Sequence, residues 1–212
     1  RVIDDFRYPF RDRLDVYEFT ENQFFVKPNN FVINQYKDSD IVLMNDDIEI
    51  IDDHWLCNLF DAAYISPFIG AAGGKILSAD RKISEAGGEM YKNGRGRNLG
   101  RGAEADSPEF NFQRYVGFVS GCLLYMKRSA IEQCGMLDED FHPMYYEDVA
   151  WQYTLHMAGL KTIYEPSCTV IHREGSTAGT DVNSGMKRFQ EINRSKFLEK
   201  FSGINIEEYN HQ

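Results

Sequence analysis

The sequence predicts an α/β domain in which helices flank a sheet that contains parallel strands. Two observations support this fold class. Segments of strand-like apolar composition alternate with segments of helical periodicity over most of the 212 residues, as in a single layered α/β structure. In addition, residues 41–44 form a short run that is apolar on both faces, which is typical of a parallel strand covered from both sides.

Composition narrows the class of protein. Hydrophobic residues make up 42 % of the chain and aromatic residues 14 %, so we expect a packed core. The 33 acids and 23 bases give a net charge of −10, which argues against a nucleic-acid partner because phosphate binding needs a basic surface. The chain contains no run of about 18 apolar residues, so no transmembrane helix is predicted. Residues 1–10 lack the apolar core of a signal peptide.

The cysteines predict reduced, mostly buried thiols in a cytosolic protein. They are widely spaced and form no CxxC pair, so a zinc site is not expected. They are Cys57, Cys122, Cys134 and Cys168.

The first third of the chain predicts strand, helix, strand and helix in that order. Residues 14–19 predict a strand, and Pro28 suits the first turn of a helix that continues to Gln35. The buried strand 41–44 follows. Asp53 is expected to be the N-cap of the next helix, in which apolar residues recur at helical spacing. These apolar residues are Trp55, Leu59 and Ala62.

The middle of the chain predicts strands around one long irregular stretch. Residues 69–77 are an apolar run, and residues 83–91 predict a strand pair or hairpin. Residues 92–112 hold four glycines but lack the G-K-[ST] ending of a phosphate-binding loop. Long loops are usually functional or disordered, so two interpretations stay open: a mobile solvated loop, or a loop that contacts an anionic or sugar acceptor. Its basic residues are Lys92, Arg95, Arg97 and Arg101.

A long apolar strand is expected over residues 115–128. Gly117 and Gly121 interrupt it, and glycine inside a strand indicates that another group approaches the backbone closely. Ser129 is expected to cap the short helix that follows, and Gly135 to end it.

The last part of the chain predicts two helices separated by a strand region. Residues 147–160 predict a helix ended by Gly159, and residues 161–173 predict one or two strands. Residues 185–203 predict an amphipathic C-terminal helix. Its residues near helical spacing are Phe189, Ile192, Lys196 and Phe197.

Three polar clusters could carry chemistry, and the first is Asn45, Asp46 and Asp47. It follows directly on the buried strand 41–44, and ligands of open α/β sheets bind outside the carboxyl ends of strands. Carboxylates at such a place can hold Mg²⁺ or Mn²⁺, which prefer oxygen ligands and also bind phosphates. The alternative is a polar turn, because Asn and Asp favour turns.

The second cluster is Glu147 and Asp148 at the start of a predicted helix. Asp148 shares one helical face with Trp151 and Leu155. An acid beside bulky apolar groups is partly desolvated, which raises its pKa and suits it to act as a base. The alternative is a structural role, since acids in a first helical turn are stabilised by the helix dipole and by free N–H groups.

The third cluster is His172, followed by Ser176 and Thr177. Val170 and His172 point to the same side of a predicted strand. A neutral imidazole can join carboxylates around Mn²⁺, and the two hydroxyls lie in a Gly-containing loop where they could meet phosphate. The alternative is a structural histidine at the end of a strand.

In this order and spacing, the clusters resemble glycosyltransferase family 2, whose members are inverting, nucleotide-sugar-dependent enzymes with the GT-A fold. Residues 21–50 resemble the family's Asn-rich helix, strand and DxD-type metal motif. Residues 116–177 resemble its acceptor half, with a small-residue strand, a G-x-[FL]-D-E-x-F turn, an ED motif at a helix start and a His before a Gly/Ser loop. The resemblance covers residues 21–201 and is nearest to rhamnosyltransferase-like members that elongate polysaccharides.

The resemblance implies donor-side roles for the first and third clusters. Asp47 would bind the divalent cation, Mn²⁺ or Mg²⁺, that bridges the two phosphates of the donor. His172 would be a further metal ligand or a phosphate contact, and Ser176 would also contact the donor. Asn45 and Asp46 would line the donor ribose and sugar.

The resemblance also implies roles for the second cluster and for the glycine-interrupted segment before it. Asp148 would be the base that deprotonates the acceptor hydroxyl, with Glu147 as the less favoured choice. Gly121 and Cys122 would sit under the donor sugar, where a larger side chain would clash.

The fold that the resemblance implies is GT-A-like, with a mixed, mainly parallel sheet flanked by helices and truncated at the N-terminus. Residues 1–212 would form one such domain without the family's first strand-helix-strand unit, which holds the nucleotide base. This departure keeps a second interpretation open, a catalytically inactive GT-A-like module that binds a glycan or a protein. A metal-dependent phosphohydrolase using Asp46 and Asp47 is disfavoured, because no Lys or Ser/Thr phosphate motif accompanies them.

The chemistry of an inverting transfer fits these residue types. One in-line displacement needs one base and one Lewis acid, and no second carboxyl group as in glycoside hydrolysis. The expected partners are a UDP-, GDP- or dTDP-sugar donor and a glycan or lipid-linked saccharide acceptor. The expected location is the cytoplasm, or the cytoplasmic face of a membrane by peripheral association, although the net charge of −10 disfavours simple electrostatic docking to anionic lipid.

Overall fold

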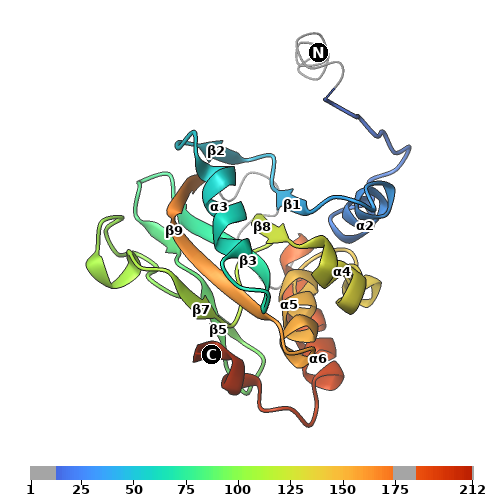
Figure 1. Cartoon of the computed structure of the whole chain (residues 1–212). Coiled ribbons are helices and arrows are strands. Elements are labelled where there is room, and N and C mark those ends of the chain that lie inside the picture. The colour runs from blue at the N-terminus through green and yellow to red at the C-terminus, as the bar shows by residue number, and fades with distance from the viewer. Residues whose placement is uncertain (1–12, 174–184, 212) are drawn as a thin grey trace.

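A parallel pair of strands, β3 and β9, forms the centre of the fold. The structure is a computed structural model that describes residues 13–173 and 185–211 (Figure 1). β3 (Ile69–Leu77) is an apolar strand in which every residue is buried. β9 (Lys161–His172) runs parallel to it. Both strands belong to a seven-stranded sheet that contains parallel and antiparallel pairs.

The other strand pairs in the described part of this sheet are antiparallel. β8 (Leu123–Met126) lies between β3 and β1 (Ile41–Met44), and β2 (Ile48–Ile50) pairs with the end of β9. The mixed α/β fold is therefore confirmed, but the expectation of a mainly parallel sheet was wrong. An apolar strand does not reveal its direction, because both kinds of pairing can be covered on two faces. β1 is also not covered on both faces along its whole length, since Met44 at its end is 46 % exposed.

Of the strands in the middle region, one joins the main sheet and two form a separate pair. β4 (Ile83–Glu85) pairs with β3, whereas β5 (Gly88–Met90) pairs with β6 (Gly96–Asn98) in a separate two-stranded ladder. The two strands expected over residues 83–91 are confirmed, but they do not form a hairpin with each other. Residues 92–112 were wrongly expected to be irregular throughout, since they contain β6.

The strand expected over residues 115–128 is two strands. β7 (Arg114–Val116) pairs with β9, and β8 begins only at Leu123. The residues between them form a loop because Ser120 and Gly121 bond to side chains, Glu85 and Asp148, rather than to a neighbouring strand. The glycines at this point mark the break that the sequence pattern underestimated.

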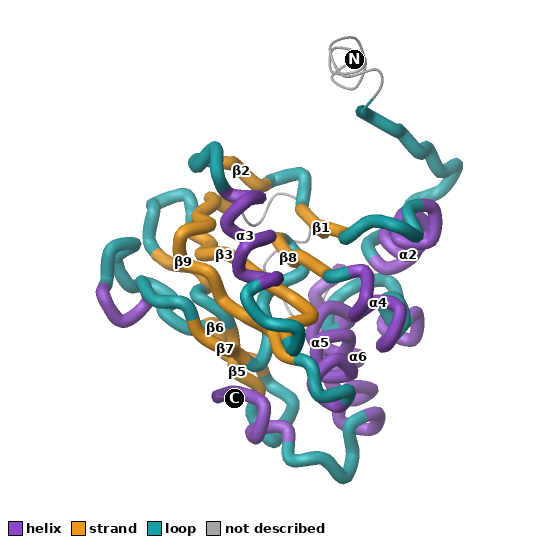
Figure 2. Tube along the Cα trace, in the orientation of Figure 1, coloured by secondary structure: helices purple, strands orange, loops and turns teal. Residues whose placement is uncertain are grey.

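Helices cover both faces of the sheet (Figures 1 and 2). α3 (Trp55–Tyr64) packs against β3 and β9 through the side of the helix that carries Leu59 and Ala63. On the other face lie α2 (Val26–Gln35), α4 (Arg128–Cys134) and α5 (Glu147–Met157), which share one apolar core. α6 packs on α5 in a further aromatic core and extends over Arg188–Lys200. The short 3-10 helices are Pro108–Phe110, Glu139–Phe141, Gly185–Lys187 and Ile206–His211.

The strand expected over residues 14–19 is absent. These residues carry no regular secondary structure, because strand-like composition needs a neighbouring strand to pair with. Tyr17 and Phe19 instead place their rings edge-on against Phe31 of α2, at centroid distances of 5.0 Å and 5.6 Å.

Both expected helix caps differ from the structure. The helix α3 begins after His54, and Asp52 rather than Asp53 accepts the hydrogen bond from the His54 backbone N–H, at 2.9 Å. The helix α4 begins after Lys127, so Ser129 lies inside its first turn and caps nothing. Gly135 does end α4, with φ of 83°.

The C-terminal helix is confirmed, but its buried face differs from the expected one. Phe197 is buried as predicted, whereas Ile192 is 45 % exposed and Asn193 is fully buried. The four cysteines are free, as expected, and only Cys122 and Cys168 are buried. Among the described residues, no helix combines the length and apolar character that crossing a membrane requires.

The packing of α5 can be tested with one buried and one exposed residue of that helix. Leu155 is fully buried, whereas Met157 is 56 % exposed. Leu155→Ala is expected to lower the free energy of unfolding by about 2–5 kcal/mol, because it leaves a cavity beneath the sheet. Met157→Ala, the control, should change it by less than about 0.5 kcal/mol. Urea denaturation checks both, and equal effects would contradict the described packing.

Candidate active site

The three polar clusters meet at one cleft of about 460 Å³. It lies where the start of α5, the end of β9, the turn after β1 and the β5–β6 hairpin come together. The lining residues used below are Asn45, Arg95, Gly121, Cys122, Glu147, Asp148, His172 and Glu191. Segments that are more than 100 residues apart in the chain thus contribute to a single site, as the order of the motifs predicted.

The turn between β1 and β2 carries the first cluster. The backbone N–H of Asn45 donates to the carbonyl oxygen of Cys122 at 3.0 Å, and the Asp47 carbonyl oxygen accepts from the backbone N–H of Arg173 at 3.0 Å. Because Ile48 lies opposite His172 in the β2–β9 ladder, Asp47 is held beside the histidine ring.

The Asp47 and His172 side chains contact each other beside the cleft. Asp47 Oδ1 lies 3.0 Å from His172 Nε2, yet this oxygen is buried and has no partner in hydrogen-bond geometry. Asn45 Nδ2 lies 3.4 Å from the same ring nitrogen. A carboxylate oxygen and an imidazole nitrogen are ligands that suit Mn²⁺, so these residues fit a divalent cation. Within the described part of the chain, no three His, Cys, Asp or Glu side chains converge on one point.

Asp46 lies at the same turn but is exposed, and neither Asp46 nor Asp47 is among the residues that line the cleft. Asp47 adjoins the cleft through its contact with His172, which does line it. Ser176, with Thr177, falls within residues 174–184 and so lies outside the described residues.

The loop before β8 is fastened to the second cluster. The backbone N–H of Gly121 donates to Asp148 Oδ2 at 2.7 Å, and that of Val149 donates to Asp148 Oδ1 at 2.8 Å. A Cβ at Gly121 would lie 3.1 Å from the Asp148 Cβ, so the glycine permits the close approach that the sequence predicted. The neighbouring Cys122 thiol is buried, which raises its pKa and leaves it unreactive at neutral pH.

The two adjacent carboxyl groups of the second cluster are desolvated. Burial raises the pKa of Asp148, and the hydrogen bonds from Gly121 and Val149 partly oppose this effect. Burial raises the pKa of Glu147 well above its usual range, and the nearby Asp148 adds to the shift. Glu147 is 5 % exposed, and its Oε2 has no hydrogen-bond partner. The sequence therefore predicted the desolvation correctly, although Glu147 is the more strongly affected of the two.

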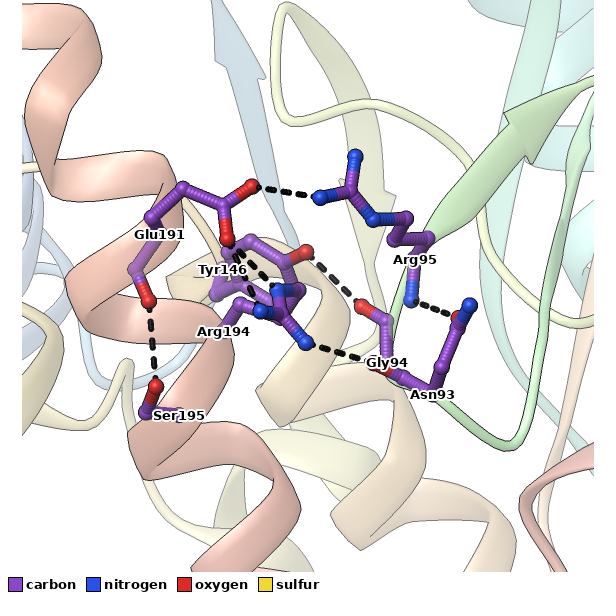
Figure 3. Close-up of polar contacts among 7 residues, drawn as sticks. All are labelled: Asn93, Gly94, Arg95, Tyr146, Glu191, Arg194 and Ser195. Carbon is purple, nitrogen blue, oxygen red and sulfur yellow. Dashed lines mark hydrogen bonds and ion pairs between the residues drawn. The ribbon is translucent and has the colours of Figure 1, made fainter. Parts of the chain in front are cut away.

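The rim of the cleft on the α6 side is a polar network that the sequence did not predict (Figure 3). Arg95, at the tip of the β5–β6 hairpin, contacts Glu191 of α6 at 3.1 Å. Tyr146, directly before the carboxyl pair, donates its hydroxyl to the Gly94 carbonyl oxygen at 2.8 Å. Three of the four basic residues of the 92–112 stretch thus meet carboxylates of the chain itself: Arg95 meets Glu191, Arg97 meets Glu89, and Lys92 meets Glu207.

Comparison with known proteins places this fold in a class. No model of a known protein family matches the chain. Two solved structures share its fold: GalNAc-T7 with UDP, GalNAc and Mn²⁺, and the mannosyltransferase PcManGT from Pyrobaculum calidifontis with GDP-Man and Mn²⁺. Their TM-scores are 0.66 and 0.58 at 12 % and 13 % identity. They cover 95 % and 94 % of this chain, and the matches span 47 % and 56 % of those chains. The chain therefore has the GT-A fold.

Curated relatives agree with this class. The chain is 30 % identical over 156 residues to the N-acetylglucosaminyl-diphospho-decaprenol L-rhamnosyltransferase of Mycobacterium tuberculosis, a match that covers 68 % of the chain and 50 % of the relative. It is 26 % identical over 159 residues to the O-antigen biosynthesis protein RfbC of Myxococcus xanthus, which covers 72 % of the chain and 12 % of that protein. The chain thus spans half or less of the length of these relatives.

Fold and sequence together identify a GT-A domain of the glycosyltransferase class. Within that class, the chain is related to a rhamnosyltransferase and to a protein of O-antigen biosynthesis. The resemblance drawn from the ordered motifs is therefore confirmed.

The buried state of Glu147 predicts a specific pH dependence of stability. Its folded pKa is raised, so the folded state keeps the proton after the unfolded chain has lost it near pH 4.3. As the pH rises from there to the folded pKa, the free energy of unfolding falls by about 1.4 kcal/mol per pH unit. A side chain that is neutral at every pH causes no such fall. Glu147→Gln, neutral at every pH, should therefore gain stability relative to the unmutated protein between pH 4 and pH 8.

Thermal unfolding at these two pH values measures this gain. Glu132 of α4 is exposed, so Glu132→Gln is the matched control and should show no such gain. An equal response of the two variants would mean that the Glu147 carboxyl is hydrated in the folded protein.

Proposed function

We propose that this chain is the catalytic domain of an inverting glycosyltransferase. It would move a sugar from a nucleotide-diphosphate sugar to a hydroxyl group of a glycan or a lipid-linked saccharide. The observation that carries the proposal is that one cleft of a GT-A fold contains both a pair of buried carboxyl groups and the His172 ring, which lies 3.0 Å from Asp47. In support, one solved structure with the same fold contains the nucleotide sugar GDP-Man, and one relative is named for a lipid-linked saccharide.

Asp47 and His172 would form the donor side of the reaction. Asp47 Oδ1 and His172 Nε2 would bind Mn²⁺, with Mg²⁺ as the alternative, and Asn45 would orient the ring through its 3.4 Å contact. A bound divalent cation would supply Lewis-acid stabilisation of the departing diphosphate. Asp46 and Ser176 would contact the ribose or phosphates of the donor, with Gly121 and Cys122 under the donor sugar.

Asp148 would be the general base. Its carboxylate takes the proton of the acceptor hydroxyl while the hydroxyl oxygen forms a bond to the anomeric carbon. The bond between that carbon and the diphosphate oxygen breaks, and the nucleoside diphosphate leaves with the bonding electrons. Burial raises the pKa of Asp148 toward the pH at which the enzyme works. A general base is most effective when its pKa lies near that pH. The donated bonds from Gly121 and Val149 fix its orientation.

The acceptor class sets where the enzyme works. A lipid-linked acceptor would bring the protein to a membrane surface, so peripheral association on the cytoplasmic side is part of this proposal. A soluble glycan acceptor would need no such contact.

Metal-dependent binding of a nucleoside diphosphate tests the donor side. UDP, GDP and dTDP are titrated into the full-length gene product by calorimetry, with and without Mn²⁺. At least one of them should bind only with Mn²⁺, and Asp47→Asn should weaken this binding by roughly 10-fold or more, because it removes a charged ligand. Asp53→Asn, the control, alters an exposed carboxylate outside the cleft and should leave binding unchanged. Absence of all binding would favour the inactive binding module instead.

A second substitution tests the base. Asp148→Asn should abolish sugar transfer, because an amide cannot accept the acceptor proton, yet it should spare binding of the nucleoside diphosphate. Single-turnover assays with the donor identified by calorimetry measure this. Retained transfer by Asp148→Asn would exclude Asp148 as the base and direct attention to Glu147.

A further inference from the structure

The segment that leads into the carboxyl pair has an unusual backbone. Tyr145 and Tyr146 have φ values of 76° and 74°, so two successive residues with large side chains occupy the left-handed region. Such residues are strained and persist only where the surroundings hold them. Tyr146 is also the N-cap of α5, and it makes no side-chain capping bond. The direction in which Glu147 and Asp148 leave this segment therefore depends on contacts from elsewhere.

One buried side chain of α6 makes most of those contacts. Asn193 is fully buried, and its Nδ2 donates to three backbone carbonyl oxygens: those of Phe141 at 2.8 Å, Met144 at 3.0 Å and Tyr145 at 2.9 Å. An amide nitrogen has two hydrogens, so one hydrogen is shared between two of the oxygens. A single residue thus bonds the backbone of residues 141–145 at three points.

The polar network at the rim holds the other end of the segment (Figure 3). The Tyr146 hydroxyl donates to the Gly94 carbonyl oxygen at 2.8 Å, and its ring lies 5.6 Å from that of Phe197 of α6. Arg194, next to Asn193, donates to the Asn93 carbonyl oxygen at 2.9 Å. The β5–β6 turn, α6 and Tyr146 are therefore connected as one unit.

We propose that Asn193 is a positioning residue for Glu147 and Asp148. Its amide nitrogen donates to the Tyr145 carbonyl oxygen and to those of Met144 and Phe141 before it. These bonds hold the left-handed segment that directs the two carboxyl groups into the cleft. The helix starts immediately there, since the Ala150 N–H donates to the Tyr146 carbonyl oxygen at 2.8 Å. The assignment of a catalytic consequence rests on the proposed function, whereas the backbone geometry does not.

The chemistry of the amide explains why asparagine occupies this position. Its Oδ1 is buried without a hydrogen-bond partner, which is unfavourable for stability. Replacing Asn193 by an apolar residue would remove this acceptor but would leave three carbonyl oxygens without their donor. Aspartate has nearly the same shape but only acceptor oxygens when ionised, so it would repel the same carbonyl oxygens. Asn193→Asp is therefore the sharpest change of the hydrogen bonding at constant volume.

The test compares Asn193 with a second buried asparagine. Asn30 of α2 also bonds a loop backbone, since its Nδ2 donates to the Leu137 carbonyl oxygen at 2.8 Å and its Oδ1 accepts from the Leu137 N–H at 3.0 Å. Asn193→Asp and Asn193→Ala should each lower kcat for sugar transfer by roughly 10- to 100-fold, as small displacements of reacting groups do. Their affinity for nucleoside diphosphate with Mn²⁺ should stay within about threefold, because the donor-side ligands do not move. Asn30→Ala should lower kcat by less than about threefold.

The kcat and affinity measurements are made at a temperature at which unfolding curves show that every variant is folded. Unchanged kcat in both Asn193 variants, or an equal loss in Asn30→Ala, would overturn the positioning role. Crystal structures of Asn193→Ala and of the unmutated protein provide a readout that does not depend on activity. The variant should lose the positive φ of Tyr145 or Tyr146, and retention of both values with unmoved carboxyl groups would also overturn it. If the unmutated protein transfers no sugar, the proposed function fails, and the crystal structures alone decide the positioning role.

Discussion

The parallel ladder between β3 and β9 is the constraint on which the rest of the structure depends. β3 is buried throughout, and the two strands approach so closely that a Cβ at Gly74 would lie 2.5 Å from the Cys168 carbonyl oxygen. Small residues in β3 make this approach possible. The ladder fixes the path of β9, and β9 ends at His172 opposite Ile48. The position of Asp47 beside His172 therefore follows from packing at the centre of the sheet.

The opposite wall of the cleft is built differently, because its two carboxyl groups are buried although burial disfavours their charged forms. Asp148 receives backbone N–H groups from Gly121 and Val149, whereas Glu147 Oε2 receives none. A left-handed segment and a buried amide with an unpaired oxygen lie directly beside them. Each of these features lowers stability, and such features persist at sites where function requires the geometry. The apolar cores shared by α5 and α6 with the sheet offset them.

Sequence reasoning succeeded where the signal was local and failed where it depended on distant partners. The apolar run 69–77 and the helix that begins at Glu147 were predictable from local patterns. The meeting of the three polar clusters was instead implied by the resemblance to a known family. Strand direction was not, because an apolar strand such as 41–44 is compatible with either sense of pairing. The role of Asn193 was also hidden. Its acceptors lie about 50 residues earlier in the chain, and a polar residue in a helix usually faces water.

In the proposed function, Asp47 and His172 form the donor side of the site, and Glu147 and Asp148 form the acceptor side. The most direct measurement is a crystal structure of the protein with Mn²⁺ and the nucleoside diphosphate that it binds, using the anomalous signal of manganese to locate the ion. The account predicts one manganese peak in contact with Asp47 Oδ1 and His172 Nε2, with the diphosphate on its far side and the Glu147 and Asp148 carboxyl groups free of metal. A manganese peak on Glu147 or Asp148 instead would contradict it.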